Sequence, residues 1–154
     1  MTYDWEHDTF YIVNSNLQIR ELRKDGSLGS AITPANVVCI APVTYVGNGE
    51  FLSLDFNTRN YVRIAADRST PQLAHSDGLQ GWSSSMVYNR EDGKCYICYT
   101  NMQNGDDTSS VGFWGKLFAI DPVTGEGEYR GFIGEDYGTY VNGMCFICLL
   151  YTSD

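Results

Sequence analysis

Two pairs of cysteines have the spacing of a metal-binding motif. Cys95 and Cys98 enclose Tyr-Ile, and Cys145 and Cys148 enclose Phe-Ile, which is the C-x-x-C spacing found in four-thiolate zinc sites. However, Tyr, Ile and Phe favour extended chain, and residues i and i+3 of a strand point to opposite faces. Because the two thiols of a pair then cannot bind one ion, we predict that Cys39, Cys95, Cys98 and Cys145 are small buried apolar residues. A disulfide between neighbouring strands stays open as an alternative.

No motif of nucleophilic catalysis or phosphate binding occurs in the chain. It has neither the G-x-S-x-G turn of a nucleophile elbow nor a G-x-x-x-x-G-K-[ST] loop. His75, Ser76 and Asp77 are adjacent in sequence, whereas a catalytic triad is assembled in space from distant residues. We therefore expect His75 to be a solvated loop residue and assign no catalytic residue.

Two groups of polar residues offer oxygen atoms to a cation. The segment 104–108, Asn-Gly-Asp-Asp-Thr, carries ligands that calcium prefers, but it lacks the full EF-hand pattern. A polar turn is the simpler interpretation, so calcium is the one cofactor left open. Asp4, Glu6 and Asp8 alternate along an expected strand, and we predict that they face solvent.

Composition and charge exclude several classes of protein. A net charge of −9 over 154 residues argues against nonspecific binding to nucleic acid or to anionic membranes. No apolar run approaches the ~20 residues of a membrane helix, and the first ten residues, MTYDWEHDTF, contain no apolar signal segment. The 16 glycines, 4 prolines and 14% aromatic residues suit many short strands joined by tight turns.

Strand-like segments separated by Gly, Asn and Asp run through the chain, and no window shows the 3.6-residue period of a helix. The clearest pair is a hairpin at 116–134. There Pro122 presets the turn, Asp121 can accept hydrogen bonds from backbone amides further on, and Gly125 can adopt a positive φ. We expect strands at 10–13, 17–22, 36–45, 51–56, 61–65, 85–88, 95–99, 116–120, 129–133 and 141–147.

Three parts of the chain share one pattern. TYDWEHDTFYIV, TYVGNGEFLSLDF and MVYNREDGKCYICY each read as a strand, a polar turn and a second strand. The second strands begin near Phe10, Phe51 and Cys95, with spacings of 41 and 44 residues. Third strands follow at LQIREL, YVRIAA and KLFAID, and fourth strands are expected around 30–33, 72–75 and 129–133. A period of about 40–50 residues with four strands per unit is typical of propeller blades.

The third unit resembles a known repeat. GKLFAIDPVTGEGEYRGFIG, followed by YVNGMCF, is similar to the repeat of secreted bacterial β-propellers, whose units read L-Y-x-I-D-x-x-T-G, and Phe118 replaces the usual Tyr. The resemblance implies fold more strongly than function. It predicts an all-β, incomplete β-propeller of about three four-stranded antiparallel blades plus the first strand of a fourth. The blades would span about 1–34, 35–78 and 79–134, and the fourth would begin at 135–147.

Three blades do not close a ring, because complete propellers have about 4–8 blades. We therefore expect a fragment with an open end that exposes blade faces and strand edges. Residues 148–154, CLLYTSD, resemble a translated sequencing adaptor and are predicted to be a non-native tail. The alternative is that they continue the last strand.

The topology predicts a ligand-binding rim. In up-and-down blades the long loops at 74–82, 100–115 and 134–140 would lie on one face, where scaffolds of this kind place ligands. A glycan or a protein is the expected ligand, and a secreted or cell-surface bacterial binding module the expected parent. A propeller hydrolase, lyase or quinoprotein whose active site lies outside this chain is the alternative, and a purely structural repeat is a third. The rim would contain His75, Asp77, Trp82, Asp106, Asp107, Trp114, Asp136 and Tyr137, although Trp82 and Trp114 could equally fill gaps between blades.

Overall fold

The computed structural model describes residues 1–14, 16–36, 40–55, 58, 60–71, 73, 83, 85–99, 116–133 and 144–145. These residues form three antiparallel sheets, so the all-β prediction is confirmed. Within this part of the chain, no helix is long and apolar enough to cross a membrane.

Each sheet is a meander in which every strand pairs with the next one in sequence. The first sheet contains β1 (Thr2–Asp4), β2 (Thr9–Val13), β3 (Ile19–Leu22) and β4 (Leu28–Ile32). The second contains β5 (Ile40–Gly47), β6 (Glu50–Asp55) and β7 (Tyr61–Ile64). The third contains β8 (Ser85–Asn89), β9 (Lys94–Tyr99), β10 (Lys116–Ile120) and β11 (Gly127–Phe132).

The repeat that the sequence predicts is present in the strand order. The second strands of the three sheets, β2, β6 and β9, begin at Thr9, Glu50 and Lys94, one residue before the predicted starts. The predicted strand 116–120 has the same bounds as β10. The first three strands of the three units therefore correspond in order.

The fourth strands follow the prediction less closely. β11 begins at 127 rather than 129. The described part of the second sheet has three strands, and of its predicted fourth strand, 72–75, the structure describes only Leu73. Hydrogen bonds nevertheless continue beyond β7, because Arg63 donates its backbone N–H to Pro71 O (3.2 Å) and Leu73 donates to Tyr61 O (2.8 Å). Of the predicted strand 141–147, the structure describes only residues 144–145, which are not in a strand.

The turn between β10 and β11 has the predicted chemistry. One carboxylate oxygen of Asp121 accepts the backbone N–H groups of Val123 (2.8 Å) and Thr124 (3.2 Å), and Gly125 has a φ of +79°. The other oxygen accepts a hydrogen bond from Lys94 Nζ at 2.8 Å. This ammonium and the turn amides hold the pKa of Asp121 below its usual value.

The second sheet is buried on both faces. Because side chains alternate along a strand, Phe51 packs with Ile19 of the first sheet. Its neighbours Leu52 and Leu54 pack with residues of the third sheet such as Ile97. The period-two pattern of β6 thus contributes to two hydrophobic clusters at once and joins all three sheets.

A hydrogen bond between two tyrosines crosses the junction of the second and third sheets. The hydroxyl oxygens of Tyr61 on β7 and Tyr99 on β9 lie 2.6 Å apart, and the two residues are 0% and 1% exposed. Burial strengthens such a bond and makes the loss of one partner costly.

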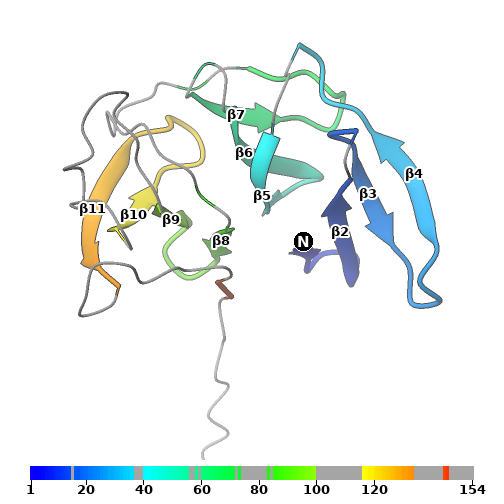
Figure 1. Cartoon of the computed structure of the whole chain (residues 1–154), viewed down its shortest axis with the longest axis horizontal. Helices are drawn as coiled ribbons and strands as arrows, with labels where there is room; N and C mark the ends of the chain where they lie inside the picture. The colour runs from blue at the N-terminus through cyan, green and yellow to red at the C-terminus, as the bar shows by residue number, and fades with distance from the viewer. Residues whose placement is uncertain are drawn as a thin grey trace, which may run out of the picture.

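The three sheets lie side by side along an arc (Figure 1). Their first strands, β1, β5 and β8, lie on the inside of the arc, whereas β4, β7 and β11 lie on the outside. Contacts between β1 and β5, and between β5 and β8, join the inner strands. Residues far apart in the sequence therefore meet on the inside of the arc.

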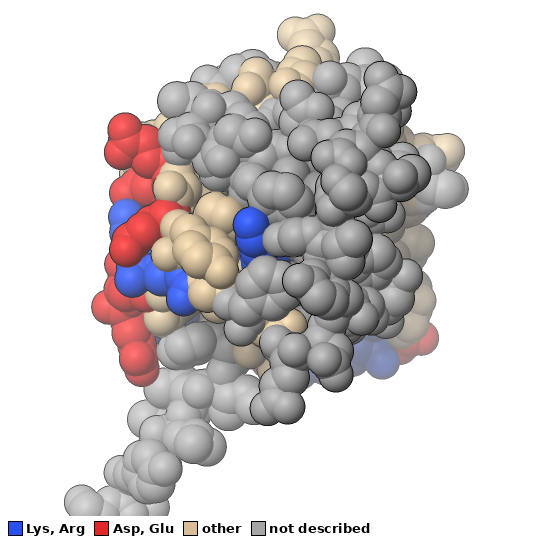
Figure 2. Space-filling model, turned by 60° about the vertical axis from the view of Figure 1, so that its left-hand side comes forward, with Lys and Arg blue, Asp and Glu red and all other residues tan. Residues whose placement is uncertain are grey.

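Charged side chains mark an outer edge of the molecule. On β11, the last strand of the third sheet, the exposed Arg130 and Glu128 form an ion pair at 3.0 Å. Figure 2, which turns the side of the third sheet forward, shows acidic and basic side chains together along one edge. Solvated charges of this kind oppose pairing with strands of another molecule.

Replacing Tyr99 with Phe is expected to lower the free energy of unfolding by about 1–2 kcal/mol, because it removes one hydroxyl from the buried tyrosine pair. Urea denaturation followed by circular dichroism measures this. The matched control is Tyr96→Phe, which removes an exposed hydrogen bond to Asp92 and should change stability by less than ~0.5 kcal/mol. Equal effects of the two substitutions would contradict a stabilising role for the buried pair.

Candidate functional site

The predicted rim falls outside the part of the chain that the structure describes. This applies to the whole predicted set and to the calcium-type segment 104–108, so their assignment stays a prediction. The residues concerned are His75, Asp77, Trp82, Asp106, Asp107, Trp114, Asp136 and Tyr137.

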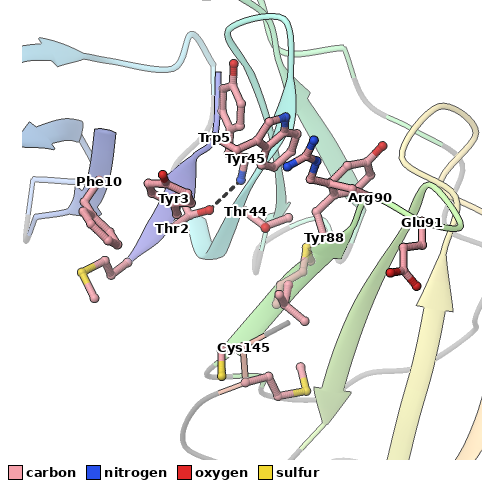
Figure 3. Close-up of a pocket in the computed structure, with 14 residues that line it drawn as sticks. Thr2, Tyr3, Trp5, Phe10, Thr44, Tyr45, Tyr88, Arg90, Glu91 and Cys145 are labelled. Atoms are coloured by element: carbon pink, nitrogen blue, oxygen red, sulfur yellow. Dashed lines mark hydrogen bonds between the residues drawn. The ribbon is translucent and has the colours of Figure 1, made fainter. Parts of the chain in front are cut away.

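The described residues form an open pocket of about 820 Å³ on the inside of the arc, which we call the hub pocket (Figure 3). Among the described strands, β1, β5 and β8 each pair with one neighbour, and all three contribute residues to the pocket. Its walls are formed by Met1, Thr2, Tyr3, Trp5, Phe10, Thr44, Tyr45, Met86, Val87, Tyr88, Arg90, Glu91, Met144 and Cys145.

Hydrogen bonds fix the first hairpin against the second sheet. Tyr45 donates its backbone N–H to Thr2 Oγ1 at 2.8 Å, the bond drawn as a dashed line in Figure 3. The Glu6 carboxylate accepts the Tyr45 hydroxyl and the backbone N–H of Asn48 at 2.8 Å. Burial and the bond to Glu6 raise the pKa of Tyr45. The turn after β1 thus holds one wall of the pocket in place.

Trp5 sits at the meeting point of the three sheets. Its ring stacks on Tyr88 of the third sheet, with centroids 5.3 Å apart and an interplanar angle of 12°. It meets Tyr45 of the second sheet edge-on, at 4.9 Å and 70°. The guanidinium carbon of Arg90 lies 5.2 Å from the Trp5 ring centroid, within the range of a cation–π interaction.

Sequence reasoning missed this cluster, because the tryptophans singled out were Trp82 and Trp114. The available signal was a large aromatic residue in a turn whose neighbours are charged, at the start of a repeat unit. That signal does not show which distant residues Trp5 contacts.

The prediction that Asp4, Glu6 and Asp8 alternate along a strand and face solvent is wrong for Asp4. β1 ends at Asp4, and Asp4 is only 2% exposed. One of its oxygens accepts the backbone N–H groups of Glu6 (2.9 Å) and His7 (3.2 Å), and the other lies 2.9 Å from His7 Nδ1. The carboxylate is buried because it closes the turn that follows it.

Potential ligand atoms of Asp4, Glu6 and His7 lie within 4.8 Å of one another, which is close enough to hold a metal ion. Both oxygens of Asp4 already accept hydrogen bonds within the turn, and Glu6 is bonded to the second sheet. These hydrogen bonds explain why the side chains of Asp4, Glu6 and His7 lie close together without invoking a bound cation.

The cysteine prediction is confirmed at two positions and wrong at one. Cys95 and Cys98 are free and 0% exposed. They lie three residues apart on β9 and therefore on opposite faces of the strand, and Cys95 packs with Ile97 in the core. Burial raises the pKa of both thiols, that of Cys98 to about 11, which disfavours the reactive thiolate.

Cys145 is exposed, because Met144 donates its backbone N–H to Ser85 Oγ at 2.7 Å and the next residue lies beside the open hub pocket. Cys39 and Cys148 lie outside the described residues.

No protein-family model matches the chain, and no curated protein is significantly similar to it in sequence.

The pKa of His7 is expected to lie above its ordinary value of about 6.5, because its imidazole is hydrogen-bonded to the Asp4 carboxylate. Protonation of His7 therefore stabilises the fold below pH ~6.5, and this contribution is lost as the pH rises through the raised pKa. NMR titration of the His7 ring should show the raised value, and in Asp4→Asn a value that returns toward 6.5. Asp8→Asn, an exposed change in the same turn, is the control. Identical titration curves in wild type and Asp4→Asn would contradict the pairing.

Proposed function

We propose that the chain is part of an incomplete β-propeller that acts as a ligand-binding module, with the hub pocket as its binding site. Three consecutive antiparallel meanders with the same strand order support a propeller-type arrangement. The position of the first strand of every sheet on the inside of the arc is a second support (Figure 1).

A comparison of the equivalent face of each sheet gives a further argument for the propeller-type arrangement. Each sheet carries a row of directly opposed residues that begins with a tyrosine on its first strand. The rows are Tyr3–Phe10–Leu22–Leu28, Tyr45–Phe51–Ile64 and Tyr88–Cys95–Ile120.

In the second and third sheets this row packs against the preceding sheet. Phe51 belongs to the cluster shared with the first sheet, and Cys95 belongs to the cluster shared with the second. In the first sheet the same row is open, with Tyr3 41%, Phe10 45% and Leu28 38% exposed. The row is covered in the second and third sheets and open in the first. This difference supports a ring that continues beyond the first sheet.

The observation that carries the binding function is the hub pocket itself. Its volume of about 820 Å³ lies within the usual range for ligand sites of about 300–1,000 Å³. Aromatic and aliphatic side chains dominate its walls. The ligand classes expected from the sequence, a glycan or a protein segment, remain the proposed partners, and a secreted or cell-surface location remains the proposed setting.

Replacing Phe10 and Leu28 together with Ser is expected to reduce binding of the dye 1-anilinonaphthalene-8-sulfonate severalfold, because it removes two members of the exposed row. Dye fluorescence and concentration-dependent light scattering provide the measurement. Val123→Ser is the control, since Val123 is 63% exposed but lies in a turn outside the row. If the double variant and the parent behave alike, the row is not an open docking face.

Replacing Val87 with Trp is expected to weaken ligand binding at least about tenfold by filling part of the hub pocket. Two neutral probes represent the two ligand classes, cellotriose and the peptide N-acetyl-Ala-Phe-Ala-amide. In wild-type protein, one of them should shift the amide NMR signals of Thr44 and Tyr88. Val123→Trp adds the same side chain at an exposed turn and should leave binding unchanged. The binding proposal fails if neither probe shifts these signals in wild-type protein.

A further inference from the structure

The hub pocket combines apolar walls with one cationic group. Apart from the N-terminal amine of Met1, Arg90 is the only basic residue among those that line it. The ion pairs formed by described residues lie elsewhere, and none of them includes Arg90. Among the described residues, it contacts the ring of Trp5. Within this part of the chain, the hydrogen-bond donors of its guanidinium can therefore pair with a ligand.

The structure holds Arg90 at the pocket wall. It follows β8, and the turn after it is closed by the bond from Gly93 N–H to Asn89 O (2.9 Å) and by Asn89 Oδ1, which accepts the backbone N–H of Glu91 (3.0 Å). The planar guanidinium lies over the Trp5 ring, which is itself stacked on Tyr88. A planar group held in this way presents paired N–H donors that match a carboxylate.

The nearby carboxylates of the protein have other partners. Asp4 is bonded to its own turn and to His7, and Glu6 is bonded to Tyr45 and Asn48. Glu91 also lines the pocket, but among the described residues no carboxylate forms an ion pair with Arg90. An anionic group on a ligand would supply the missing partner.

The remaining walls select the rest of the ligand. Trp5 and Tyr88 present stacked rings, and Met86, Val87 and Met144 add aliphatic surface. An uncharged sugar would leave many of its hydroxyl groups without partners on such walls, which is unfavourable. An aromatic or aliphatic group would instead bury apolar area.

We propose that the hub pocket binds a carboxylate that is joined to an aromatic or aliphatic group, with the carboxylate paired to Arg90 and the apolar group packed against the aromatic walls. This inference rests on the proposed ligand-binding function and refines it. The same chemistry occurs in a free organic acid and at the end of a peptide chain, and the test separates these two sources.

The test compares acids with their neutral amides on the full chain. The small-molecule probes are 3-phenylpropionate and 3-phenylpropanamide, and the peptide probes are N-acetyl-Ala-Phe with a free carboxylate and the same peptide as its amide. Dissociation constants come from NMR titration of the Thr44 and Tyr88 amide signals. Wild-type protein should bind at least one acid about tenfold more tightly than its amide, as expected for a charge-assisted pair.

Arg90→Gln should abolish this preference, and Arg90→Lys should keep only part of it because an ammonium lacks the planar fork. The matched control, Arg23→Gln, removes the same charge from an exposed arginine that is paired with Glu21 and should keep the full preference. If only 3-phenylpropionate binds more tightly than its amide, the ligand is a free organic acid. If only the peptide acid does so, the ligand is the end of a peptide chain.

The two proposals fail in distinguishable ways. Equal binding of acids and amides by wild-type protein overturns the carboxylate inference and leaves ligand binding intact, and it does so without any variant. A preference that survives in Arg90→Gln also overturns the inference. If neither the charged nor the neutral probes bind, the ligand-binding function itself is wrong.

Discussion

Burial of the second sheet on both faces is the constraint on which the rest of the structure depends. Side chains along β6 alternate, so Phe51 enters the cluster with the first sheet while Leu52 and Leu54 enter the cluster with the third. Neither outer sheet has a described hydrophobic cluster that excludes the second. The positions of all three sheets therefore depend on a central sheet whose two faces are both buried.

This arrangement brings the first strands together and creates the hub pocket. Once the sheets pack face to face, β1 contacts β5 and β5 contacts β8. Trp5 can then contact Tyr45 and Tyr88, and Glu6 can bond the hairpin that follows β5. The pocket is a consequence of sheet packing and not of any local motif.

The charge pattern of the pocket differs from that of the whole chain. The chain has a net charge of −9, yet the acidic residues around the first turn, Asp4 and Glu6, are held by hydrogen bonds. Arg90 keeps its cationic group beside the Trp5 ring. A local anion site in an acidic protein is reasonable, because interactions beyond about 10 Å are largely screened at physiological ionic strength whereas contacts in a pocket are screened less.

The sequence alone predicted strands such as β9 and β10, the turn that follows β10 and the spacing of the second strands, because these depend on residues close together in the chain. Asp121 and Gly125 define their turn by local chemistry, and the run of strand-favouring residues from Cys95 to Tyr99 indicates a strand without knowledge of its neighbours. Only the tertiary structure decided that Asp4 is buried, that Cys145 is exposed and that Trp5 meets Arg90. These outcomes depend on which faces of distant strands pack together, and no local pattern of residue types encodes that choice.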